Sequence, residues 1–161
     1  MLKAKRSSHC GGFFKGVTGP LAAACIALFA APSAALADDA AFTRTADSSE
    51  IQWGPCPAFM PEGCGLAVLQ GDPAQPNADA LFRLAAGTTA PPHWHHSAER
   101  MVLLSGEMEV TYEGQDPVTL KPGTYAYGPP RLSHDATCRS DDDCVLFIAF
   151  EEPVDAIATE K

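Results

Sequence analysis

The sequence predicts an all-β domain, folded as a sandwich or barrel, behind a cleaved signal peptide. Short runs of β-forming residues alternate with turn residues along most of the chain. The 13 glycines and 14 prolines among 161 residues suit many short elements joined by turns, and they do not suit a helical bundle. No long segment has the periodicity of an amphipathic helix. A chain of this length forms one domain with its own core rather than two.

The overall charge excludes one class of partner. The chain has 11 Lys or Arg residues and 20 Asp or Glu residues, which gives a formal net charge of -9. Neutralising phosphates requires a basic face, so we expect no nucleic-acid binding. An acidic chain does not attract anions in bulk, so an anionic substrate would need a local cation or a metal.

Residues 1–37 have the pattern of a secretory signal peptide. They contain four Lys or Arg residues and no acidic residue, followed by the apolar run Leu21–Ala31 and the small-residue end Ala35–Ala37. The run is too short for a transmembrane span, which needs ~20 apolar residues. Lipoprotein cleavage at Cys25 is the less favoured alternative, because most of the apolar stretch follows that cysteine. We expect a periplasmic or secreted mature chain that starts at Asp38 and has no membrane attachment.

Four cysteines remain after the expected cleavage, and an even number in an exported small domain indicates disulfides. Three connectivities are open. Local pairing of Cys56 with Cys64 and of Cys138 with Cys144 is favoured, because each bond closes a short loop. A zinc site is disfavoured, since no C-x-x-C spacing occurs. Residues 38–65 are therefore interpreted as an N-terminal extension that contains a stapled loop, meaning the loop closed by the expected Cys56–Cys64 disulfide.

The barrel is expected over residues 66–152, and residues 153–161 follow it as a C-terminal tail. Seven runs with β character are separated by glycine, proline or aspartate turns. In chain order the expected strands are Leu66–Leu69, Ala80–Leu84, Met101–Leu104, Met108–Tyr112, Val118–Leu120, Thr124–Tyr127 and Val145–Phe150.

The segment around His93 has the residue types and spacing of a metal site. Side chains alternate faces along an extended strand, so His93, His95 and Glu99 share one face by parity. Two imidazoles and a carboxylate are ligands for zinc and similar divalent ions. Trp94 and His96 have the opposite parity and should point away.

A second segment supplies a third imidazole. A strand entering from Pro129 would bring His134 to the same centre, so three of the four histidines after the leader fall on proposed ligand positions. Arg131 lies near the mouth of this site and is a candidate bidentate clamp for a substrate carboxylate. A solvent-exposed loop cation is the favoured interpretation of Arg131.

Together the two segments resemble the paired motifs of the cupin superfamily. Two positions depart from the family pattern: Arg131 stands for the usual Gly and Cys138 for the usual Asn. The resemblance covers about Leu66 to Phe150 and implies a single jelly-roll β-barrel. The matching residues are Gly87, His93, His95, Glu99 and Gly106 in the first motif and Gly123, Pro129 and His134 in the second.

The resemblance implies one divalent transition metal held by His93, His95, Glu99 and His134, with Fe, Mn, Ni, Cu and Zn all compatible. It implies a small-molecule substrate and, as the favoured function, a dioxygenase-like oxidoreductase. Glu99 is also a candidate proton acceptor. The alternatives are a binding or sensing module without turnover and a cupin isomerase or lyase, because one fold serves many reactions. A homodimer is compatible with the resemblance.

Overall fold

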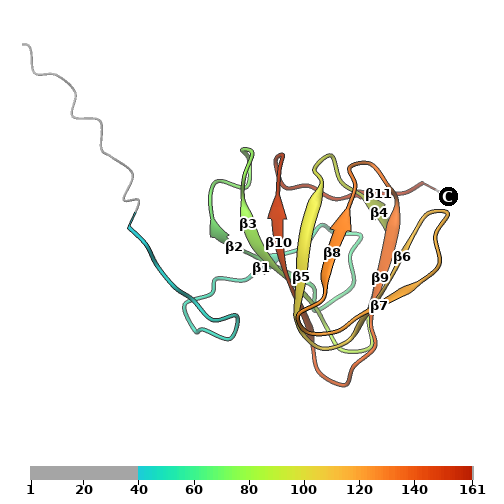
Figure 1. Cartoon of the computed structure of the whole chain (residues 1–161), viewed down its shortest axis with the longest axis horizontal. Coiled ribbons are helices and arrows are strands. Elements are labelled where there is room, and N and C mark those ends of the chain that lie inside the picture. Colours follow the sequence, from blue (N-terminus) through green and yellow to red (C-terminus); the bar gives the residue numbers. More distant parts are fainter. Residues whose placement is uncertain (1–39, 161) are drawn as a thin grey trace, which may run out of the picture. The chain divides into compact units, whose positions relative to one another are not determined.

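Eleven short strands form two antiparallel sheets in the computed structural model, which describes residues 40–160 (Figure 1). No helix occurs among these residues, and therefore none that is long and apolar enough to cross a membrane. The predicted all-β fold is confirmed. The predicted signal peptide, residues 1–37, lies outside the described residues.

One sheet has six strands and the other has five. The six-stranded sheet runs β1 (Gly54–Pro55), β2 (Gly65–Gln70), β3 (Asp79–Leu84), β10 (Cys144–Phe150), β5 (Glu99–Ser105) and β8 (Tyr125–Gly128). The five-stranded sheet runs β11 (Ile157–Ala158), β4 (Thr89–Trp94), β9 (His134–Cys138), β6 (Met108–Tyr112) and β7 (Val118–Leu120). The sequence did not predict β1, in the N-terminal extension, or β11, in the expected tail. β11 pairs with β4, so this edge of the sheet is covered by the C-terminal segment.

The main core has the two-residue alternation expected of strands that bury one face. Every second residue of β10, from Cys144 to Phe150, is buried, and the residues between them are half-buried. In β9 the same alternation buries His134, Ala136 and Cys138. The alternation that packs the core therefore also directs His134 to the inside.

A smaller apolar cluster covers the other face of the six-stranded sheet. Ala67 and Leu81 lie opposite each other on β2 and β3, and Phe147 pairs with Leu81 from β10. Ile51 and Trp53 of the N-terminal extension pack against these residues. The extension is thus part of the folded unit, which explains why the outward residues of β10 are only half-exposed.

The four cysteines of the described residues form two disulfides, Cys56–Cys64 and Cys138–Cys144. This is the local pairing that the sequence favours. The second bond joins the end of β9 to the start of β10 across the acidic turn at residues 139–143. It ties the five-stranded sheet to the six-stranded one.

We expect the native protein to contain no free thiol among these four cysteines. The bonds close loops with sequence separations of 8 and 6 residues, so each should stabilise the fold by less than the ~3 kcal/mol of a 15-residue loop. Mass spectrometry under non-reducing conditions measures the pairing. Four alkylatable thiols in the native protein would contradict it.

Candidate metal centre

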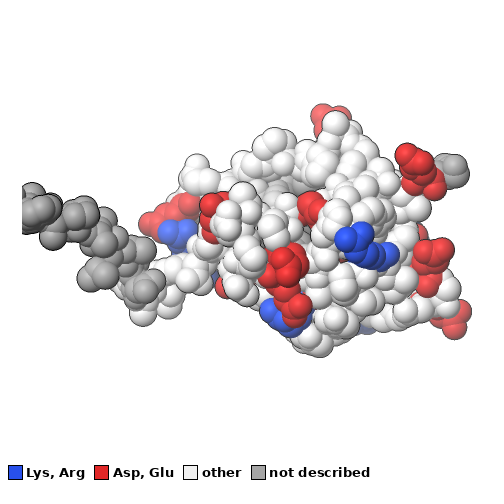
Figure 2. All heavy atoms as spheres, turned by 90° about the horizontal axis from the view of Figure 1, so that it is seen from above, with Lys and Arg blue, Asp and Glu red and all other residues white. Residues whose placement is uncertain are grey.

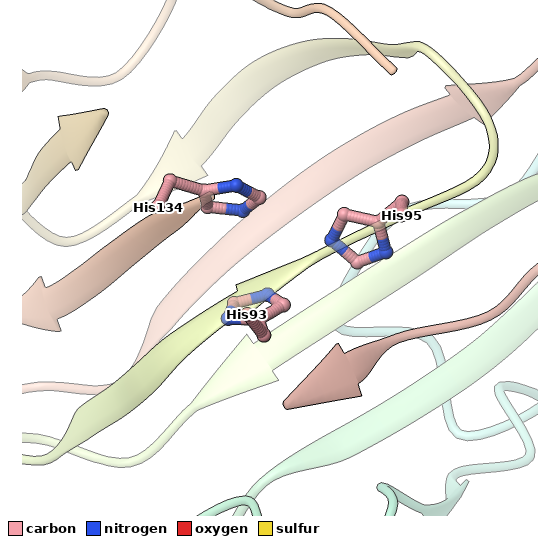
Figure 3. A group of neighbouring side chains, drawn as sticks. All are labelled: His93, His95 and His134. Carbon is pink, nitrogen blue, oxygen red and sulfur yellow. The ribbon is translucent and has the colours of Figure 1, made fainter. Parts of the chain in front are cut away.

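The three predicted histidine ligands come from adjacent parts of the five-stranded sheet (Figure 3). His93 lies in β4 and His134 begins β9, and the antiparallel register places these two residues directly opposite each other. His95 follows the last residue of β4. The strand pairing therefore brings together residues that are about forty positions apart in the sequence.

Glu99 reaches the same place by a different route from the one that strand parity assumed. The chain bends at residues 96–97, and Glu99 begins β5 in the six-stranded sheet. Parity along one continuous strand is therefore the wrong reason for its position. Glu99 faces the histidines because the two sheets face each other across the core.

The four side chains are buried and close together. The candidate ligand nitrogens of His93, His95 and His134 all lie within 4.8 Å of one another, so these residues could hold a metal ion. Glu99 Oε1 lies 3.4 Å from His95 Nε2, and Glu99 Oε2 lies 3.7 Å from His134 Nε2. The carboxylate thus stands beside two of the three imidazoles.

Backbone carbonyls fix which nitrogen of each ring is free. His93 Nδ1 donates to Pro91 O at 2.7 Å and His134 Nδ1 to Leu132 O at 3.2 Å. His95 Nδ1 donates to the carbonyl oxygen of Asp155. Since a carbonyl only accepts, each Nδ1 carries the proton and Nε2 keeps its lone pair, which is the arrangement typical of metal-bound histidine.

His95 Nε2 is buried and has no hydrogen-bond partner. Buried polar atoms are normally satisfied, so an orphaned nitrogen lone pair between two imidazoles and a carboxylate fits a bound cation.

Burial also keeps His93 and His134 neutral. The pKa of His93 is lowered to about 4 and that of His134 to about 3, mainly by burial and in smaller part by the neighbouring histidines. Burial raises the pKa of Glu99, while His95 acts in the opposite direction. At neutral pH His93 and His134 therefore offer lone pairs, and a cation at the site would favour the charged form of Glu99.

The metal-free protein should lose stability as the pH falls from 7 toward 4. The depressed pKa of His93 means that the unfolded chain binds more protons between pH 6.5 and about 4, which costs about 3 kcal/mol of unfolding free energy. His134 adds to this loss down to about pH 3, whereas the raised pKa of Glu99 offsets part of it. The urea concentration at the midpoint of unfolding, measured on chelator-treated protein at several pH values, gives the dependence of stability on pH. His134→Gln should weaken this dependence. An unchanged dependence in that variant would contradict the assignment of a depressed pKa to His134.

Asp155 is a contributor that the sequence analysis missed. Its carbonyl holds His95, and its carboxylate accepts from the backbone N of His96 at 3.0 Å and from His96 Nδ1 at 2.5 Å. His96 is exposed, as its parity predicts. In the sequence Asp155 looks like any other acidic residue of the C-terminal segment, because its partners His95 and His96 lie about sixty positions earlier in the chain.

Arg131 does not line the cavity beside the histidines. Its side chain is exposed and lies over the ring of Trp94, 5.5 Å from the ring centre. Its backbone N donates to His95 O at 2.8 Å, and its φ of 63° is in the left-handed region that favours glycine. The residue thus adopts the conformation that explains the usual Gly of the cupin motif, and the structure does not place it as a substrate clamp.

A cavity of about 180 Å³ lies next to the histidines, between the two sheets. Its lining includes His93, His95, Glu99 and His134 together with Tyr112 of β6. The Tyr112 ring centre is 5.0 Å from that of His134. Sequence analysis missed Tyr112 as a site residue, because an aromatic residue in a strand is usually part of the core.

Acidic side chains outnumber basic ones on the face of the molecule seen in Figure 2. This distribution agrees with the negative net charge of the whole chain. Long-range attraction of anions to this face is therefore not expected.

Comparison with known families identifies the fold. The family model for the ChrR cupin-like domain matches residues 43–153. No curated protein sequence matches the chain. Among solved structures, a cupin-2 domain from Rhodospirillum rubrum has a TM-score of 0.61 at 13% identity, covering 74% of this chain and 82% of that chain.

Two enzymes share the fold at similar levels. The polyketide cyclase RemF from Streptomyces resistomycificus has a TM-score of 0.59 at 16% identity, covering 74% of this chain and 87% of that chain. The DMSP lyase DddQ from Ruegeria pomeroyi has a TM-score of 0.59 at 21% identity, covering 68% of this chain. This chain spans 61% of the lyase's length. At such identities the likeness shows the fold alone. Because the family model matches most of the chain and the two sheets form the jelly roll of these neighbours, the chain belongs to the ChrR cupin-like family of the cupin superfamily.

Proposed function

We propose that this protein is an exported metal-dependent oxidoreductase of the dioxygenase type, acting on an oxygen-bearing small molecule. The observation that carries the proposal is the cluster of three buried histidines beside a cavity, each with its Nδ1 hydrogen-bonded to a backbone carbonyl. Two disulfides support export, because such bonds persist in oxidising compartments.

The donor set defines what the site can hold. His93, His95 and His134 would bind a divalent transition metal through Nε2, with Glu99 as the fourth ligand. Nitrogen and carboxylate donors are compatible with Fe, Mn, Ni, Cu and Zn. A metal with four protein ligands keeps one or two positions open, and when bound it supplies Lewis acidity or, if redox-active, oxygen activation.

The residues around the site hold the three imidazoles and place a carboxylate beside them. The carbonyls of Pro91, Leu132 and Asp155 hold the three imidazoles in place. Glu99 is buried between His95 and His134, so it is positioned to accept a proton from a bound substrate. Dioxygenation incorporates both atoms of O2 into the product, so this reaction type needs no separate reductant.

Oxygen uptake by the metal-loaded protein tests the proposal. The panel contains enediols, flavonols, diketones and sugar acids, and we expect one class to drive consumption of one O2 per substrate. His95→Ala should abolish uptake because it removes a metal ligand, and Tyr125→Phe on the exposed strand β8 should leave it unchanged. Tight binding without uptake across the panel would reject the enzyme and favour a binding or sensing module.

A further inference from the structure

The cavity beside the histidines has an apolar body and a single polar cluster. The polar cluster consists of the three histidines, Glu99 and Tyr112, whose side chains lie close together. Asp155 also lines the cavity, but its carboxylate accepts from His96 and its carbonyl oxygen accepts from His95. The rest of the lining is mainly aliphatic, aromatic or thioether, as in Leu66, Phe82, Met108, Val110, Leu146 and Ile148. Among the described residues that line it, no Lys or Arg occurs. A ligand rich in hydroxyl groups would leave most of them unpaired against such a wall, which is unfavourable.

The size of the cavity limits the ligand as well. Its volume is about 180 Å³, and an engineered apolar cavity of about 150 Å³ in another protein holds benzene. One ring or a short branched chain therefore fits inside it, and the second of two linked rings would have to extend beyond it. Residues Cys56, Pro57 and Met60 of the stapled loop and residues 154–156 contribute to the lining, so both segments limit its extent.

Tyr112 places a hydrogen-bond donor inside the polar cluster. Its Oη is buried and has no partner, as is His95 Nε2, so two of the three such atoms among the described residues belong to this cavity. A Cβ built on Gly128 would lie 2.8 Å from Tyr112 Oη and 3.2 Å from Glu99 Oε2, so both oxygens converge beside this glycine. A tyrosine hydroxyl carries a proton that it can donate, so Tyr112 offers a hydrogen bond to an oxygen atom bound at this position.

We infer that the ligand of this site is a small molecule of about one-ring size that is apolar except for an oxygen-containing group at one end. The oxygen-containing group lies at the histidine cluster and accepts a hydrogen bond from Tyr112 Oη. The apolar body occupies the space among Phe82, Leu146 and Ile148. This inference rests on the proposed function, because the oxygen group binds where the metal would be held. Tyr112 is the specificity-determining residue that pairs with the ligand oxygen.

Three carboxylates with the same head group test this inference. Benzoate has a one-ring apolar body, gluconate a polyol body, and biphenyl-4-carboxylate two linked rings. Calorimetry on the protein with its divalent metal, and on chelator-treated protein as background, gives the affinities. We expect benzoate to bind at least about tenfold more tightly than either of the other two, and only when the metal is present.

A matched pair of variants tests the role of Tyr112. Tyr112→Phe keeps the ring and removes only the hydroxyl, so it should weaken benzoate binding about tenfold and leave the metal content unchanged. Tyr125→Phe makes the same change on an exposed residue and should alter neither value. Unchanged benzoate affinity in Tyr112→Phe would overturn the assignment of this residue.

The outcomes separate the two proposals. Metal-dependent binding of gluconate or the biphenyl acid as tight as that of benzoate would overturn the ligand class while leaving the metal-centred site in place. Metal-independent binding, or no binding, of all three acids would overturn the inference, whereas the metal-centred function on which it rests is decided separately by the metal content and the oxygen uptake of the protein.

Discussion

Replacing His95 by alanine should remove most of the bound metal, whereas replacing its neighbour His96 should leave near-stoichiometric metal. His95 is buried, and its unpaired Nε2 faces the other two histidines and Glu99. Losing a residue that only supports a ligand typically costs 10- to 100-fold in metal affinity, so losing the ligand itself should cost about a hundredfold or more. Metal content by mass spectrometry and affinity by chelator competition measure the difference.

His96 is the matched control because it is the same residue type one position along the chain. It is exposed and pairs with the carboxylate of Asp155, outside the cluster of ligands. Glu99→Gln should fall between the two variants, since the amide oxygen still coordinates but carries no charge. If His96→Ala loses as much metal as His95→Ala, the arrangement of the histidines is wrong.

Replacing Gly106 by alanine should lower the unfolding free energy by about 3 kcal/mol. Gly106 has a φ of 79°, and an added Cβ would lie 2.8 Å from Cys144 Sγ and 3.0 Å from Cys144 Cα. The left-handed backbone costs an alanine about 1–2 kcal/mol, and overpacking against fixed atoms adds ~1–3 kcal/mol. Urea unfolding of the oxidised protein measures the change.

Gly114 is the control for the backbone contribution. It has a similar φ of 75°, but nothing lies within 4 Å of the position that its Cβ would take. Gly114→Ala should therefore cost only about 1 kcal/mol. Equal losses at the two positions would mean that the packing of the turn at Gly106 against the Cys138–Cys144 disulfide is not tight.

The sequence alone predicts the strands whose pattern of residue types lies within the strand and its flanking turns. The alternation of apolar residues predicts β6 and β10 almost to the residue, and the glycine and aspartate turns between strands predict their ends. Strand β4 carries Pro91 and Pro92, which weaken a strand prediction because proline cannot donate to the ladder. In the structure the pairing of β4 with β9 shifts register between Ala90 and His93, so the prolines fall at an irregularity.

The candidate site could be predicted only in part from the sequence. His93, His95 and His134 stand out because clustered histidines are uncommon outside metal sites, and motif spacing does not depend on the fold being known. Tyr112 and Asp155 carry no such signal. Their roles depend on which strand lies beside which, and that is decided by tertiary packing.

Metal analysis of the protein purified from its native compartment tests the central claim most directly. The account predicts one equivalent of a single divalent transition metal per chain, and its loss in the His95→Ala variant. Purified protein that carries no such metal, and that binds none of Fe, Mn, Ni, Cu or Zn when each is added after chelator treatment, would contradict it.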